Sequence, residues 1–404
     1  MDLVSVRLGE APSTPRRVRL IGDVTYDDRP GEIEQYWFEV PEAYGHSLSL
    51  SGNPWITSLL PLAVTLGEPL RISASVDPVL YANLPKVMET WARWYRRRFR
   101  GIKPVPIEAP RKSSEPGPGP RSAAGFFSGG VDSFFMVLNN PAVTNLISVH
   151  GFDIPLRAPA EFERLRSRLA SASEELGREL LDVSTNLRET RFEATRSRWG
   201  HIGHGCALAG VGLALEPRFH SVSIAGTHSD EARYPWGSHP DTDPLFSTSA
   251  TRFLHEGAGI ARSGKIAFLS RSPVAMRSLH VCWRDGSSEN CGECRKCYQA
   301  MLHLELLGAL PSPTLRKPDL GRLERLYLKS PTYEGYFREI QAKAQTAGRT
   351  DIAKMVGKCV RRSRRIRRLL KAVDWLGSHP RVSWRARRLR NRLLADRPAV
   401  KATP

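Results

Sequence analysis

The chain has 404 residues, of which 41% are hydrophobic and 25% charged, a composition typical of a globular protein with a full core. It has no run of the roughly 18 apolar residues that a membrane span needs, and residues 1–5 lack the start of a secretory signal. Six cysteines are too few for a disulfide scaffold, so we expect a cytoplasmic protein. The net charge of +19 is concentrated in residues 354–397, which hold a surplus of 14 positive charges.

Residues 1–109 predict a small α+β domain. Its expected strands are Val4–Leu8, Val18–Ile21, Gln35–Val40 and Ser47–Leu50. One helix is expected over Trp55–Leu66, since Gly67 can end it. A second begins at Asp77, an N-cap residue followed by a first-turn proline, and runs to about Arg100. We assign this domain no chemistry.

Residues 110–122 predict a linker, because their four prolines and two glycines cannot continue a helix or a central strand. The catalytic domain, residues 123–310, is expected to follow, with strands and helices in alternation. The expected strands are Ala123–Phe127, Leu146–Gly151, Leu180–Val183, Ser221–Ala225 and Ile266–Leu269. The expected helices are Ser133–Leu138, Ala158–Gly177 and Gly203–Leu215. This alternation indicates an α/β fold, a parallel sheet with helices on both faces.

The turn after the first of these strands is the clearest candidate site. Ser128, Gly129 and Gly130 carry no bulky side chain and lead into a helix, so backbone N–H groups at the helix N-terminus can hold an anion such as a phosphate chain. The hydroxyls of Ser128 and Ser133 add donors, and Asp132 can help to hold a metal ion on the phosphates. An ordinary strand–turn–helix is the alternative interpretation.

Ligands in such sheets bind beyond the carboxyl ends of the strands. That edge is expected to collect Ser128–Ser133, His150–Asp153 and Gly226–Asp230. The segment Gly259–Ile266 nearly matches the spacing of a Walker A loop, but Ile266 stands where a hydroxyl is needed, so we expect a turn followed by a strand. Four histidines are candidate bases for an attacking amine: His201, His204, His228 and His239.

Four of the six cysteines form a cluster with metal-ligand spacing. Cys282, Cys291, Cys294 and Cys297 can close a tetrahedron of thiolates around Zn²⁺, and the two-residue spacers allow tight turns. An iron–sulfur cluster is the main alternative. Four thiolates leave no open coordination position, so the role is expected to be structural. Cys206 and Cys359 are read as ordinary thiols.

Together, these two motifs resemble a known family. Ser-Gly-Gly-Val-Asp-Ser (128–133) after an apolar strand resembles the PP-loop of the N-type ATP pyrophosphatases, whose fold is HUP-like. With the four cysteines downstream, residues 123–307 resemble 7-cyano-7-deazaguanine synthase of queuosine biosynthesis. The resemblance implies an ATP-dependent, AMP- and pyrophosphate-forming ligase. It would adenylate a carboxylate, such as that of a 7-deazaguanine, for attack by ammonia or an amine.

The resemblance also implies site residues. Ser128, Gly129, Gly130, Val131, Asp132 and Ser133 would bind ATP and Mg²⁺, with Asp132 and Ser133 closest to the chemistry. The four cysteines would bind Zn²⁺. The substrate residues are expected at Asp153, His228, Asp230, His239 and Asp243. A homodimer is compatible with this interpretation.

Residues 311–404 predict a helical and strongly basic C-terminal region. From Val360 onward, arginines alternate with apolar residues at helical spacing, up to a break at Gly377–Pro380. Three interpretations stay open: binding to an anionic membrane surface, binding to RNA or DNA phosphates, or packing beside a solvated basic face. The whole chain has two alternatives to the ligase: a PP-loop enzyme that transfers sulfur to RNA, and a non-catalytic nucleotide-binding module that docks through its tail.

Overall fold

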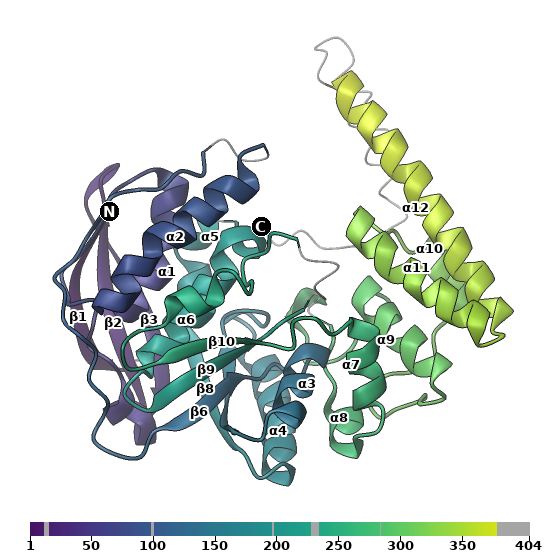
Figure 1. The fold of residues 1–404 in the computed structure, drawn as a ribbon, viewed down its shortest axis with the longest axis horizontal. Helices are drawn as coiled ribbons and strands as arrows, with labels where there is room; N and C mark the ends of the chain where they lie inside the picture. Colours follow the sequence, from purple (N-terminus) through teal and green to yellow (C-terminus); the bar gives the residue numbers. More distant parts are fainter. Residues whose placement is uncertain (12–15, 98–100, 196–197, 228–233, 283, 378–404) are drawn as a thin grey trace. The chain divides into compact units, whose positions relative to one another are not determined.

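The structure is a computed structural model that describes residues 1–11, 16–97, 101–195, 198–227, 234–282 and 284–377 (Figure 1). The chain folds into two compact units, Met1–Lys265 and Ile266–Pro404. The sequence predicts different boundaries, near residues 110, 122 and 310, whereas the two compact units meet after Lys265.

Among the described residues, the first unit contains one ten-stranded sheet with the order β10-β9-β6-β7-β8-β3-β2-β1-β4-β5. Its strands are β1 (Asp2–Glu10), β2 (Arg17–Tyr26), β3 (Arg29–Pro41), β4 (Leu70–Ile72), β5 (Ile107–Glu108), β6 (Ser122–Phe126), β7 (Val143–His150), β8 (Glu179–Thr185), β9 (Phe219–Ala225) and β10 (Arg252–Glu256). The helices are α1 (Asn53–Leu66), α2 (Pro78–Tyr95), α3 (Val131–Asn139), α4 (Pro159–Glu175), α5 (Arg191–Ala194) and α6 (His204–Ala214).

The five strands from β6 to β10 are parallel, which confirms an α/β fold. Within this parallel part, β6 is the first strand in the sequence and lies at the centre. The next strands, β7 and β8, lie on one side of β6, and β9 and β10 lie on the other side. The direction of the connections therefore reverses between β6 and β9. In open α/β sheets, ligands bind at the carboxyl ends of the strands beside such a reversal.

Helices cover both faces of this parallel part. A Cβ added at Gly125 of β6 would lie 2.5 Å from Met136 of α3, and one added at Gly212 of α6 would lie 2.8 Å from Phe253 of β10. Gly125 and Phe253 align with consecutive residues of β9, so they point to opposite faces. The helices α3 and α6 thus enclose the sheet from both sides, with small residues at the closest approaches.

One expected strand of this sheet is wrong. Residues 266–269 belong to α7 (Arg262–Leu269), and the fifth parallel strand is β10. Ile266 and Leu269 are both buried while Phe268 is 40% exposed, which is the periodicity of a helix face. A run of four apolar residues is too short to separate strand from helix. The fifth strand, β10, was not predicted because it begins and ends with the charged residues Arg252 and Glu256 and so has no apolar run.

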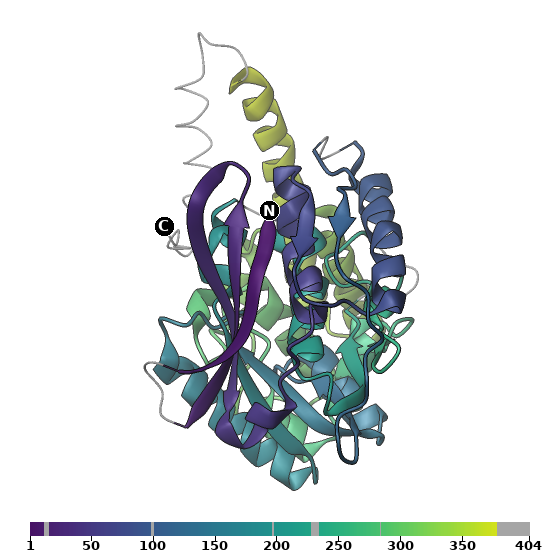
Figure 2. The same ribbon diagram turned by 90° about the vertical axis from the view of Figure 1, so that its left-hand side faces the viewer.

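The N-terminal strands extend this sheet and do not form a sheet of their own. The antiparallel strands β1, β2 and β3, in purple in Figure 2, join the parallel part where Phe38 pairs with Thr185 of β8. The strand expected at Ser47–Leu50 is wrong, because a short 3-10 helix, Glu42–Ser47, precedes an extended segment. Both expected helices are present as α1 and α2, but α2 ends at Tyr95, before the expected end near Arg100. The ring of Trp55 in α1 lies 5.3 Å from that of Phe38.

The second unit is helical over its described residues. Its helices are α8 (Pro273–Ser278), α9 (Arg295–Leu306), α10 (Leu320–Arg325), α11 (Pro331–Thr346) and α12 (Thr350–Gly377), while α7 spans the boundary between the units. Phe337 and Ile340 of α11 and Val356 of α12 are fully buried, so α11 and α12 share an apolar core (Figure 1). The remainder of the basic C-terminal region expected from the sequence, residues 378–404, lies outside the described residues.

Candidate functional site

The predicted phosphate loop connects β6 to α3. Gly129 has a φ of +73°, in the left-handed region that favours glycine, and Gly130 is the N-cap of α3. No side chain caps the N-terminus of this helix. Because the first N–H groups of a helix have no partner within it, the turn is suited to hold an anion.

The polar side chains of the loop line the same turn. The Ser133 hydroxyl donates to the carbonyl oxygen of Gly130 at 3.1 Å, and the oxygens of Ser128 and Ser133 lie 3.5 Å apart. Ser128 is exposed, whereas Val131 is buried and contributes its backbone at the start of α3. The sequence prediction of a strand, a turn with small residues and a helix is confirmed here.

Asp132 is engaged by two cationic side chains that the sequence interpretation had set aside. Arg262 Nη1 donates to Oδ2 at 2.7 Å, and Lys265 Nζ donates to Oδ1 at 3.2 Å. The side chains of Asp132 and Arg262 are 15% and 12% exposed, so this ion pair is largely shielded from water. Two positive charges are therefore fixed at the predicted phosphate loop.

Lys265 belongs to the segment that resembles a Walker A loop. The segment begins with the expected turn, but the expected strand is wrong, because Lys265 lies within α7. The side chain of Lys265 is only 1% exposed. Its ammonium group also donates to the carbonyl oxygen of Gly226, just beyond β9, and lies 5.6 Å from the ring centroid of Phe135. A buried ammonium needs such partners. The lysine thus connects the loop after β6 to the end of β9.

The expected substrate residues have different surroundings. Asp153 is exposed in the turn after β7. His228 and Asp230 lie outside the described residues. His239 is buried, and its ring centroid lies 4.6 Å from that of Trp94. Asp243, the first residue of a short 3-10 helix (Asp243–Phe246), is fully buried.

Asp243 is surrounded by donors. Its carboxylate accepts hydrogen bonds from the Ser238 hydroxyl at 2.6 Å and from the backbone N–H of His239 at 3.0 Å. The Nδ1 of His255, on β10, lies 2.7 Å from its Oδ2. His255 is not among the bases predicted from the sequence, because the contact between His255 and Asp243 depends on how β10 packs.

The histidines proposed as bases at the start of α6 make aromatic contacts. The ring of His201 lies 5.4 Å from Tyr95, and that of His204 lies 5.5 Å from Trp199. His150, at the end of β7, stacks on Phe162 at 4.3 Å, and burial lowers its pKa. These contacts are those of packed side chains.

In the second unit, the four clustered cysteines converge as the spacing predicted, and they could bind a metal ion such as zinc. Their sulfurs are 3.8 Å apart for Cys282 and Cys294, 3.8 Å for Cys291 and Cys297, and 3.5 Å for Cys294 and Cys297. A tetrahedron with Zn–S bonds of about 2.3 Å has edges of about 3.8 Å, so the sulfurs fit one shared ion. That closeness favours a single ion over a cluster of several irons.

The backbone around the cysteines supports thiolates. The N–H groups of Cys294 and Cys297 point to the sulfurs of Cys291 and Cys294, at 3.3 and 3.5 Å. Hydrogen bonding with Cys282, followed by that with the other two thiols, lowers the pKa of Cys291. Gly292, with a φ of +66°, makes the tight turn that brings the ligands together.

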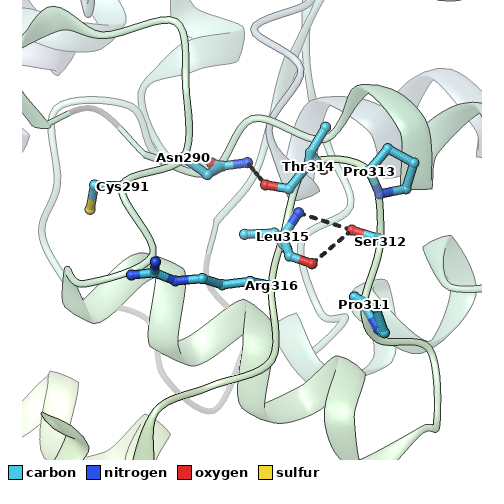
Figure 3. A pocket seen from close by; sticks show the side chains of 8 residues that line it. All are labelled: Asn290, Cys291, Pro311, Ser312, Pro313, Thr314, Leu315 and Arg316. Carbon is cyan, nitrogen blue, oxygen red and sulfur yellow. Dashed lines mark hydrogen bonds between the residues drawn. The ribbon is translucent and has the colours of Figure 1, made fainter.

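A hollow of about 300 Å³ lies beside this cluster, between Cys291 and residues 311–316 (Figure 3). Asn290 holds its wall by donating from Nδ2 to the carbonyl oxygen of Thr314 at 3.1 Å. Its Oδ1 accepts from the backbone N–H of Cys282 at 3.1 Å. The side chain of Asn290 therefore ties the segment that carries the cysteines to residues 311–316, which is a structural role.

No family model matches this chain, and comparisons with curated proteins and with solved structures found no match. Within the described part of the chain, no helix combines the length and the apolar character needed to cross a membrane.

Proposed function

We propose that the loop Ser128–Ser133 binds the phosphates of ATP, and that the protein adenylates a carboxylate for attack by ammonia or an amine. The position of the loop carries this proposal. It follows the central strand at the reversal of the sheet, with an uncapped helix N-terminus and two fixed cations beside it. The carboxylate of a 7-deazaguanine is the substrate that the sequence resemblance implies.

The reaction requires the protein mainly to position and neutralise charge. A carboxylate oxygen attacks the α-phosphorus of ATP, and the bond to the β-phosphate breaks as pyrophosphate leaves with the electron pair. The N–H groups at the start of α3 and the hydroxyls of Ser128 and Ser133 would donate to phosphate oxygens, while Arg262 and Lys265 offset the charge of the leaving group. Asp132 would hold Mg²⁺, which neutralises further phosphate charge when bound.

The test is AMP and pyrophosphate formation from labelled ATP, with Mg²⁺ and a panel of carboxylates that includes 7-deazaguanine-7-carboxylate. We expect Lys265→Met and Asp132→Asn to lower the rate by about 100-fold or more, because charge stabilisation at the transferred phosphoryl group is lost. Glu32→Gln, an exposed carboxylate of β3, is the matched control. ATP binding without AMP formation for every carboxylate would support the nucleotide-binding module instead.

We also propose that α12 contacts RNA through its basic face. Arg361, Arg365 and Arg368 are exposed and spaced four and three residues apart, so they follow one face of the helix. Val356 and Ile366 are buried within the unit. Leu369 is 43% exposed, but most of this apolar face is already packed and so is not available to insert into a lipid surface, which favours phosphate binding over membrane binding.

A further inference from the structure

The pair formed by Asp243 and His255 has the geometry of an oriented base. Both side chains are almost fully buried, at 0% and 5% exposed, and Nδ1 lies 2.7 Å from Oδ2. Ser238 and the backbone N–H of His239 also donate to the carboxylate. Because the carboxylate oxygen accepts the hydrogen bond from the ring, Nδ1 carries the proton. In the neutral ring, Nε2 is then the acceptor.

The acceptor edge of this imidazole faces the end of β9. A Cβ added at Gly226 would lie 2.6 Å from Nε2 of His255, so the ring packs directly against this glycine. The carbonyl oxygen of Gly226 accepts from Lys265, whose ammonium group also donates to Asp132 of the phosphate loop. Gly226 therefore contacts both the imidazole of His255 and the ammonium group of Lys265, which links the histidine to the cations at the loop.

We propose that His255 is the general base for the second half of the reaction, with Asp243 as the residue that positions it. This inference rests on the proposed adenylation. Its substrate class is a primary amine or ammonia. The nitrogen lone pair forms a bond to the carbonyl carbon of the acyl adenylate, and the carbon–oxygen bond to AMP breaks. AMP leaves with the electron pair, and the proton released from nitrogen passes to Nε2 of His255 and then to water.

The groups around the imidazole support this assignment. Asp243, on the 3-10 helix, contacts the imidazole directly, and Lys265 of α7 donates to the carbonyl oxygen of Gly226, against which the ring packs. Burial raises the pKa of the Cys206 thiol, and the charge of Asp243 adds to this effect, so the thiol stays neutral. In this proposal Asp243 orients the histidine, whereas the sequence predicts that it contacts the substrate.

The experiment separates the two half-reactions. Adenylation is followed by carboxylate-dependent exchange of pyrophosphate into ATP, and acyl transfer by amide formation with ammonium or methylamine. For His255→Gln, we expect amide formation at neutral pH to fall by about 100-fold more than adenylation does. Hydroxylamine, which stays unprotonated at neutral pH, should restore most of the lost transfer. His220→Gln, an exposed histidine of β9, is the matched control.

Asp243→Asn gives an independent measurement. We expect it to retain adenylation better than amide formation and to shift the pH profile of amide formation, since the amide cannot hold the imidazole in the same tautomer. Equal losses in both half-reactions, or no loss of amide formation in His255→Gln, would overturn the assignment. Absence of exchange in the wild-type protein would overturn the proposed adenylation, and this inference with it.

Discussion

Gly151 connects the end of β7 to the carboxyl edge of the sheet, in a conformation that other residues avoid. Its φ is +102°, and a Cβ at this position would lie 2.0 Å from the carbonyl oxygen of Thr185, at the end of β8. The backbones of two neighbouring strand ends therefore approach each other only because no side chain intervenes.

We expect Gly151→Ala to lower the free energy of unfolding by about 2–4 kcal/mol, since both the backbone conformation and the contact must change. Urea denaturation followed by tryptophan fluorescence would measure it. Gly177→Ala is the matched control, because Gly177 also has a positive φ, of +64°, but no atom within 4 Å of the added Cβ. Its cost should be about 1 kcal/mol. Equal costs at the two positions would contradict the steric explanation.

Individual site residues were predictable from the sequence only where their partners are local. Ser128 to Ser133 and the four cysteines lie close together in the chain, so spacing alone indicated their roles. Lys265 and His255 depend on packing between distant segments, since Lys265 reaches Asp132 across 133 residues. The one local signal is a lysine next to the apolar run Ile266–Leu269, and this signal does not identify Asp132 as its partner.

At the scale of elements, a buried carboxylate joins α11 to α12. Glu334 is 7% exposed and accepts hydrogen bonds or ion pairs from Arg338, Arg364 and Arg367. Burial alone would raise its pKa, but the three guanidinium groups outweigh this effect and lower the pKa to about 2. The carboxylate therefore stabilises the two helices as long as it stays ionised.

This depressed pKa predicts an acid-sensitive contact. The stabilisation is complete above the ordinary pKa of 4.5 and is lost progressively as the pH falls toward 2, because the unfolded chain takes up the proton first. Glu334→Gln should destabilise the α11–α12 pair by about 3 kcal/mol at pH 7 and remove most of this pH dependence. Hydrogen exchange of α11 and α12 amides between pH 7 and pH 3, corrected for intrinsic rates, would measure both effects.

A control carboxylate lies nearby. Glu324 of α10 pairs with Lys358 at 3.6 Å and is 44% exposed, so Glu324→Gln should change the exchange little. An equal response to both substitutions would show that the burial of Glu334 is not what matters.

The four clustered cysteines give a second prediction at the scale of elements. We expect the purified protein to contain about one zinc ion per chain, with the metal-binding segment losing its structure on chelation. Elemental analysis and limited proteolysis, before and after chelator treatment, would measure these effects. Cys291→Ser should abolish metal retention, whereas Cys359→Ser should not, because Cys359 is a buried thiol whose pKa is raised by burial to about 12. Iron with visible absorbance would contradict the zinc assignment.

Secondary structure was predictable where the apolar pattern was long. The strands β6 to β9 and the helices α1, α2, α4 and α6 follow from their periodicity and end signals. The pairing of β3 with β8, which joins the N-terminal strands to the parallel sheet, involves residues about 147 positions apart, such as Phe38 and Thr185. No local signal encodes such a pairing, which is why residues 1–109 were interpreted as a separate domain.

At the scale of the whole molecule, the net charge of +19 affects what the surface binds and does not determine the fold. Part of the positive charge of α12 is neutralised internally, since Arg364 and Arg367 pair with Glu334. Lys354, Arg361, Arg365, Arg368 and Lys371 are exposed along the same helix. The exposed set defines a basic face about 25 Å long at a rise of 1.5 Å per residue. It can therefore contact several successive phosphates.

We expect the full chain to bind RNA with an affinity that falls steeply as salt rises, since each neutralised phosphate releases a counterion. Replacing Arg361, Arg365 and Arg368 together by glutamine should weaken binding and reduce the slope of log K against log salt by about 2–3. The matched control replaces three arginines elsewhere, Arg7, Arg29 and Arg316, which are 45%, 55% and 62% exposed. Fluorescence anisotropy over a range of salt concentrations would give the slopes. Binding to anionic vesicles but not to RNA, or equal slopes for the two triple variants, would contradict the assignment of α12 as the RNA contact.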